Sequence, residues 1–143
     1  KYTMVEPQMG GWGATSSRDG MDGMFSTSHG DTFNCPVEIS EARYGLNVVH
    51  KSLGERPETR LGHVGGRGVS LLYELRADAT LSVGYTRAKV PVWSLGDAAP
   101  GGTNSMQILR AAGTKEYYRF VSGEKLKPGD RVLIETACGG NAD

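Results

Sequence analysis

The sequence predicts a mainly β protein built from antiparallel hairpins, with a long Gly-rich loop arm at the N-terminus and at most one short helix. Segments in which apolar and polar residues alternate, separated by short turns, predict the strands. Gly supplies 21 of the 143 residues, well above its usual share of about 7%, which indicates tight turns and close backbone approaches. Helix signals are scarce. We therefore divide the chain into a loop-rich arm, residues 1–45, and an antiparallel β domain, residues 46–143.

The N-terminal arm opens with residues 1–34, which hold few core-building aliphatic side chains and many Gly, Ser, Thr, Asp and Met residues. Its Gly10–Gly13 and Asp19–Gly23 segments have the composition of turns. Loops of this length in a compact domain are commonly functional or belong to an interface. After the loop, Val37–Tyr44 is expected to form the short helix, with Pro36 in its first turn.

The alternating segments begin at Val69. Apolar side chains at every second position from Val69 to Leu75 predict one strand. Leu81, Val83 and Tyr85 predict a second strand that returns after a short turn, so the two strands are expected to pair as a hairpin. The glycines of Gly65–Gly68 lack the Lys-Ser/Thr ending of a phosphate-binding loop, and we expect them to turn the chain sharply into the first strand.

A second hairpin is expected further along the chain. It pairs Ser105–Arg110 with Lys115–Val121 around the turn residues Ala112–Thr114. Lys127–Asp130 has Pro in the second position and Gly in the third, which suits a type II turn. This turn leads into a last predicted strand, Arg131–Thr136.

Composition argues against two classes of partner. The 16 basic residues balance 16 acidic ones, so a general attraction to nucleic acid or an anionic membrane is not expected. No apolar run approaches the roughly 20 residues that span a bilayer.

The cysteines and the N-terminus bear on location and processing. Two cysteines, Cys35 and Cys138, are too few for a disulfide scaffold, so we expect reduced thiols and a cytoplasmic location. The start at Lys1 shows neither a signal peptide nor an initiator Met, and we expect a processed, split or partial chain.

The densest polar segment runs from His29 to Tyr44. A His and an Asp two residues apart can act as a general base with the group that orients it. His, Asp and Cys can also bind a metal, although the repeated ligand spacing of a zinc site is absent. The structural alternative is that these residues satisfy loop and helix-cap hydrogen bonds. Spacing alone leaves these alternatives open.

A series of motifs follows one order along the chain. In that order they resemble the hydantoinase B/oxoprolinase family, and the run from His29 to Tyr44 is the specific part of the resemblance. The motifs are Gly10–Ala14, Arg18–Gly20, His29–Glu38, Glu41–Tyr44, Gly65–Gly68, Pro128–Asp130 and Glu135–Gly140.

The resemblance implies a partner and a chemistry. It implies a hydantoinase A-type ATPase subunit that binds ATP and Mg²⁺ and phosphorylates the substrate's carbonyl oxygen. It also implies a divalent metal, Zn or Mn, on the B side but outside this chain. The implied function is a C-terminal piece, or small split subunit, of an ATP-dependent cyclic amidohydrolase of the hydantoinase/5-oxoprolinase type, inactive alone. The alternatives are a subunit of an ATP-dependent acetone- or acetophenone-type ketone carboxylase, and a structural assembly subunit.

With this resemblance, four residues become candidates for the reaction site. His29 and Asp31 are the candidate catalytic residues, and Asn34 and Arg43 are candidates for binding a substrate carbonyl or carboxylate. The chain departs from the family in length, since B proteins usually have several hundred residues. Their metal-ligand region is expected upstream of this segment, so no metal ligand is assigned. The ending Asn141–Asp143 also differs from the more usual glycine-aromatic ending.

Overall fold

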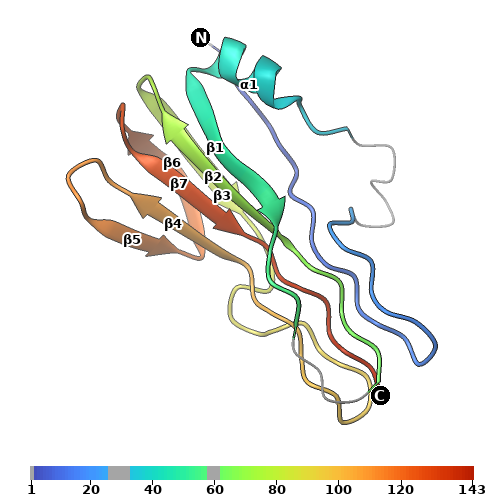
Figure 1. Cartoon of the computed structure of the whole chain (residues 1–143). Coiled ribbons are helices and arrows are strands. Elements are labelled where there is room, and N and C mark those ends of the chain that lie inside the picture. Colours follow the sequence, from blue (N-terminus) through green and yellow to red (C-terminus); the bar gives the residue numbers. More distant parts are fainter. Residues whose placement is uncertain (1, 26–32, 58–61) are drawn as a thin grey trace.

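The computed structural model describes residues 2–25, 33–57 and 62–143, and Figure 1 shows its course. This part of the chain contains one short helix and seven strands, which confirms the predicted mainly β class. The elements are α1 (Val37–Tyr44), β1 (Leu46–Leu53), β2 (Val69–Leu75), β3 (Ala79–Gly84), β4 (Ser105–Leu109), β5 (Lys115–Tyr118), β6 (Phe120–Leu126) and β7 (Arg131–Glu135).

Two antiparallel sheets enclose the hydrophobic core. Five strands form one sheet in the order β1-β2-β7-β4-β5, and β3 pairs with β6 in the other. Every second residue of β2, from Val69 to Leu75, is buried, as the alternating pattern predicts. Val121 and Leu126 of β6 join the same cluster of buried residues from the opposite sheet.

The first predicted hairpin is wrong in its pairing, although both of its strands exist. β2 pairs with β1 and β7, whereas β3 pairs with β6, so residues 76–78 carry the chain from one sheet into the other. This crossover lets Leu81 and Val83 of β3 pack against the core from the side opposite β2. Strand β1, which the sequence pattern did not reveal, takes the place beside β2.

The second predicted hairpin is confirmed, because β4 pairs with β5. The expected strand 115–121 is split, however: β5 ends at Tyr118, and β6 begins at Phe120 in the other sheet. The turn after β6 also matches its prediction. Gly129 has φ 87°, as the third position of a type II turn requires, and the N–H of Asp130 donates to the carbonyl of Lys127 (3.0 Å).

Helix α1 covers the predicted residues, with Pro36 at its N-cap position and not in its first turn. Pro36 precedes it with φ −55° and ψ 143°, and the helix ends at Gly45 in the left-handed conformation (φ 64°), which Gly adopts without strain. The Glu41 carboxylate accepts the N–H of Val48 (2.9 Å), which ties α1 to β1. Within the described ranges, no helix has the length and apolar character needed to cross a membrane.

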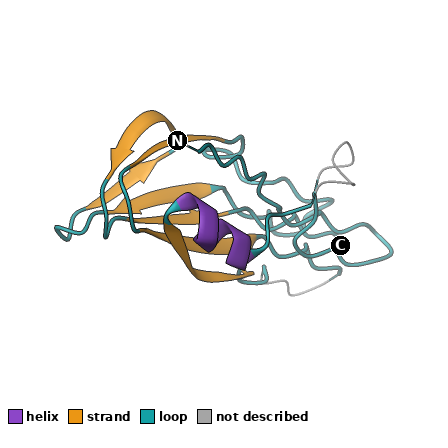
Figure 2. Cartoon of the chain, turned by 90° about the horizontal axis from the view of Figure 1, so that it is seen from above, coloured by secondary structure: helices purple, strands orange, loops and turns teal. Residues whose placement is uncertain are grey.

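Extended segments outside the seven strands lie side by side at the end of the molecule away from α1 (Figure 1 and Figure 2). Their backbones hydrogen-bond in several directions. The N–H of Gly11 donates to the carbonyl of Ala137 (3.0 Å), and the N–H of Trp12 to that of Met21 (3.0 Å). The carbonyl of Trp12 in turn accepts the N–H of Gly66 (2.8 Å). We call these segments the glycine bundle: residues 10–14, 18–24, 62–68 and 136–142.

Close backbone approach, rather than turning, explains several glycines of this bundle. A Cβ on Gly139 would lie 1.9 Å from the carbonyl oxygen of Trp12, and a Cβ on Gly66 would lie 2.0 Å from that of Met21. The predicted sharp turn at Gly65–Gly68 is therefore wrong. These three glycines have no positive φ, and the chain runs extended into β2 (Figure 1).

Candidate functional site

The structure places two of the four candidate residues at opposite ends of α1. Asn34 precedes the helix by three residues, and Arg43 lies in its last turn. From Val37 to Arg43 the helix rises about 9 Å, at roughly 1.5 Å per residue. His29 and Asp31 lie outside the described residues. The predicted roles of all four residues stay predictions.

Asn34 offers an unused hydrogen-bond acceptor. The side chain is partly buried, and its Nδ2 lies 3.9 Å from the Sδ of Met9, which is a weak acceptor. Its Oδ1 is buried and has no hydrogen-bond partner among the described residues. Such an unpaired group commonly costs about 1–3 kcal/mol. An N–H donor of a ligand would satisfy it, so Asn34 has the surroundings of a binding residue.

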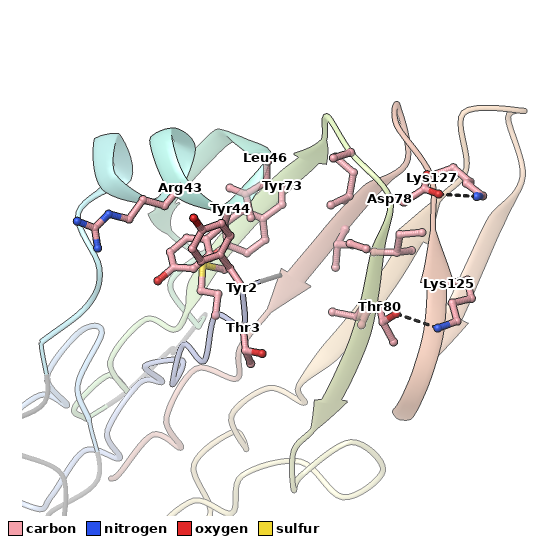
Figure 3. Close-up of a pocket in the computed structure, with 18 of the residues that line it drawn as sticks. Tyr2, Thr3, Arg43, Tyr44, Leu46, Tyr73, Asp78, Thr80, Lys125 and Lys127 are labelled. Atoms are coloured by element: carbon pink, nitrogen blue, oxygen red, sulfur yellow. Dashed lines mark hydrogen bonds and ion pairs between the residues drawn. The ribbon is translucent and has the colours of Figure 1, made fainter.

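A groove of about 850 Å³ opens between the two sheets, beside α1 and the N-terminal residues (Figure 3). We call it the inter-sheet groove. Arg43 lies at its margin, and Figure 3 shows the guanidinium directed away from the cavity. Apolar side chains of both sheets line the interior, among them Leu46, Leu75, Leu126, Val132 and Ile134.

A buried acid–base cluster adjoins this groove. The Glu6 carboxylate accepts a hydrogen bond from the Tyr73 hydroxyl and lies 2.9 Å from the Lys51 Nζ, while only 7% of the Glu6 side chain is exposed. These contacts fix the N-terminal arm to β1 and β2. Burial raises the pKa of Tyr73, and the hydrogen bond to Glu6 raises it further.

This cluster is better suited to holding the arm than to moving protons. The raised pKa keeps the Tyr73 phenol protonated at neutral pH, with its proton directed at Glu6. Sequence reasoning missed the cluster because Glu6, Lys51 and Tyr73 are far apart in the chain. The one available signal was a tyrosine on the buried face of a predicted strand, since a buried phenol usually has a hydrogen-bond partner.

Two further carboxylates brace the glycine bundle. Asp22 accepts the backbone N–H of Arg67 (2.7 Å) and its Nε (2.9 Å), and these hydrogen bonds, the side-chain one first, lower the pKa of Asp22. Asp19 accepts the N–H of Val64 (3.0 Å) and lies 3.2 Å from the His63 Nδ1. Those contacts lower the pKa of Asp19, the backbone hydrogen bond most. The Asp19–His63 pair is open to solvent, with 53% and 37% of the two side chains exposed.

Arg110 joins both sheets through three carboxylates. Its guanidinium lies 2.8 Å from Glu116, 2.5 Å from Glu124 and 3.2 Å from Asp130, which belong to β5, β6 and the turn before β7. These hydrogen bonds raise the pKa of Arg110, and those that its guanidinium donates to Glu116 raise it most. Burial alone would raise the pKa of Asp130, but the N–H groups of Lys127 and Ala111, together with Arg110, lower it below its usual value.

Asp130→Asn is expected to lower the free energy of unfolding by about 2 kcal/mol at pH 7, because hydrogen bonds to charged groups contribute roughly that much. Since the folded pKa is depressed, the stabilisation is present above the unfolded value of about 3.9 and is lost as pH falls through the folded value. The parent should therefore lose more stability than Asp130→Asn between pH 5 and pH 2. Urea unfolding midpoints of both proteins across that pH range measure the difference. Equal losses of stability would show that the charged Asp130 carboxylate does not provide this stabilisation.

No three His, Cys, Asp or Glu side chains gather to hold a metal ion in the part of the chain that the structure describes. The divalent metal that the resemblance implies is expected outside this chain, so no chemical step of this chain is assigned to a metal.

Comparisons with known proteins identify several resemblances. The family model described as hydantoinase B/oxoprolinase matches residues 1–141. An uncharacterized protein of Methanocaldococcus jannaschii, MJ0963, is 27% identical over 106 residues, which are 74% of this chain and 17% of that protein. The crystal structure of an ATP-dependent caprolactamase from Pseudomonas jessenii has the same fold, with a TM-score of 0.66 at 19% identity, over 94% of this chain and 24% of that chain. The chain thus spans less than a quarter of the length of either relative.

Proposed function

Since this chain belongs to the hydantoinase B/oxoprolinase family, we propose that it is a C-terminal piece or small split subunit of an ATP-dependent cyclic amidohydrolase. The family match over residues 1–141 is the observation that carries the proposal. The fold shared with a caprolactamase that is ATP-dependent supports it, because caprolactam is itself a cyclic amide. The proposed partners are the rest of a hydantoinase B-type protein and a hydantoinase A-type ATPase, which binds ATP and Mg²⁺.

ATP has a chemical purpose in such a reaction. An unstrained amide is a poor electrophile, and transfer of the γ-phosphoryl group to its carbonyl oxygen creates an activated carbon and a leaving group. Water then attacks that carbon, the C–N bond breaks with the proton going to nitrogen, and a second water releases phosphate from the acyl phosphate. The balanced reaction converts one cyclic amide, one ATP and two waters into an amino acid, ADP and phosphate.

The residues of this chain have separate roles in the proposal. His29 exchanges the proton of the attacking water, and Asp31 orients His29 or that water. Asn34 binds the substrate, and its buried Oδ1, which has no partner among the described residues, suits the N–H of a cyclic amide. Arg43 contacts a carboxylate or carbonyl of the substrate. The Glu6–Tyr73–Lys51 cluster fixes the arm that leads to this segment.

We expect the purified chain alone to hydrolyse neither ATP nor a cyclic amide, because it has no phosphate-binding loop sequence of the Lys-Ser/Thr type. The complex with its B-type and A-type partners should hydrolyse ATP only when a cyclic amide is added. Release of phosphate, measured with hydantoin, 5-oxoproline and caprolactam in turn, tests this. ATPase activity of the chain alone would contradict the proposal that ATP hydrolysis belongs to the A-type partner.

Bicarbonate distinguishes the second class of reaction. A cyclic amidohydrolase is expected to turn over without added bicarbonate, whereas a ketone carboxylase requires it together with a ketone. Substrate-dependent phosphate release that needs both acetone or acetophenone and bicarbonate would replace the hydrolase proposal with the carboxylase.

A further inference from the structure

The inter-sheet groove leaves apolar surface of the core open at one side. Its interior includes members of the core cluster from both sheets, such as Leu75 of β2 and Leu126 of β6. The two-stranded sheet therefore covers only part of the larger sheet's inner face. Apolar surface around a cavity of this size is commonly covered by another polypeptide or filled by a ligand.

The rim of the groove is positively charged. Arg43, Lys125 and Lys127 are the cations among the lining residues, and Asp78 is the one carboxylate among them. Lys127 pairs with Asp78 (2.8 Å), but 69% of each side chain is exposed, so this pair contributes little. Lys125 donates to the Thr80 hydroxyl (3.0 Å), as Figure 3 shows. Neither Arg43 nor Lys125 has a carboxylate partner among the described residues.

We propose that the inter-sheet groove binds an apolar segment, carrying Asp or Glu at its flank, from the rest of a hydantoinase B-type polypeptide. The inference rests on the proposed place of this chain in a larger protein of that family. Because 94% of this chain matches only 24% of the caprolactamase chain, a related protein has ample polypeptide to supply the segment. Its apolar side chains cover the floor, and its carboxylates meet Lys125 and Lys127 at the rim.

The rim charge argues against a second copy of this chain as the occupant. In a symmetric pair the same groove would face itself, which brings the cations of one rim towards those of the other. Like charges facing each other across an interface are unfavourable. An acidic segment of another polypeptide has the complementary charge.

Photo-crosslinking in the assembled complex identifies the occupant. Thr80 is exposed on β3 at the groove and bonds only to Lys125 in the described contacts, so benzoylphenylalanine at this position should leave the fold intact. Ser122, exposed on β6 and outside the groove lining, is the matched control position. The probe is the hydantoinase B-type chain, produced in one host with this chain and the A-type ATPase. Position 80 should crosslink to an apolar, acid-flanked peptide of the B-type chain, and position 122 should not.

Charge reversal provides an independent measurement. The double variant Lys125→Glu/Lys127→Glu is expected to raise the Kd for the B-type chain at least tenfold. Lys89→Glu/Lys115→Glu, which reverses two exposed charges outside the groove, is expected to change it less than twofold. Binding is measured by titration with a fluorescent B-type chain, and circular dichroism checks that each variant is folded.

The outcomes separate this proposal from the proposed function. Crosslinks from position 80 to the A-type ATPase, to a second copy of this chain or to nothing would overturn the docking proposal, and so would equal Kd values for the two double variants. A complex that forms through the groove but shows no amide-dependent ATP hydrolysis would overturn the proposed function alone. Failure of the unchanged chain to bind the B-type chain would overturn both.

Discussion

Replacing Gly139 by alanine should destabilise the protein by about 4 kcal/mol, a loss that belongs to the severe end of single substitutions. The added Cβ would lie 1.9 Å from the carbonyl oxygen of Trp12 and 2.7 Å from the backbone nitrogen of Gly13. Both obstructing atoms belong to the backbone, so no side-chain rotation relieves the overlap. The segments must separate, which breaks the hydrogen bond from Gly139 to Gly66 (2.8 Å). Thermal unfolding should show a melting temperature lower by roughly 10–15 °C.

Gly13→Ala is the matched control in the same bundle. Its nearest obstacle would be the carbonyl oxygen of Gly140 at 3.7 Å, an ordinary contact distance. The change in unfolding free energy should therefore stay within about 1 kcal/mol. If Gly139→Ala proves as stable as Gly13→Ala, the glycine bundle is not packed as described.

Local patterns revealed most strands but not their pairing. The alternation from Val69 to Leu75 fixes which face of β2 is buried, and the Pro-Gly pair fixes the turn before β7. Neither pattern says which strand lies beside which. Strand β1 was not predicted, because burial does not alternate along it and its register with β2 shifts between Val48 and His50. The crossover from β2 to β3 depends on burial between sheets, which is a property of the whole fold.

The glycine bundle and the site show the same limit. A high glycine content indicated close backbone approaches, but the contact between Gly139 and Trp12 joins residues from opposite ends of the chain. Likewise, Asn34 became a candidate because of its motif, whereas the Glu6–Tyr73 contact spans 67 positions and was not predicted. Contacts between residues so far apart leave no short-range signal in one sequence. Polar residues that gather in one segment, such as the run from His29 onward, are what a single sequence can offer as a candidate site.

That run carries the largest expected effect on activity. In the assembled complex, His29→Ala and Asp31→Asn are each expected to reduce amide turnover at least tenfold. A positioned acid–base group typically contributes 10²–10⁴-fold in rate, or about 3–5 kcal/mol of barrier. A residue that only shapes a loop would instead lower stability by about 1 kcal/mol and leave turnover nearly intact. Amide-dependent phosphate release and the melting temperature, measured on the same preparations, separate the two roles.

Ser28→Ala is the control for this pair, because it changes the residue next to His29 without removing an acid–base group. It should retain turnover within a factor of two, and ATP binding by the partner should survive in all three variants. If His29→Ala and Asp31→Asn behave like Ser28→Ala, the segment is structural and the proposed catalytic pair is wrong. If they lose ATP binding or assembly as well, their effect arises from the interface with the partner. Only a loss of turnover with assembly, ATP binding and melting temperature preserved places their action at the reacting carbonyl.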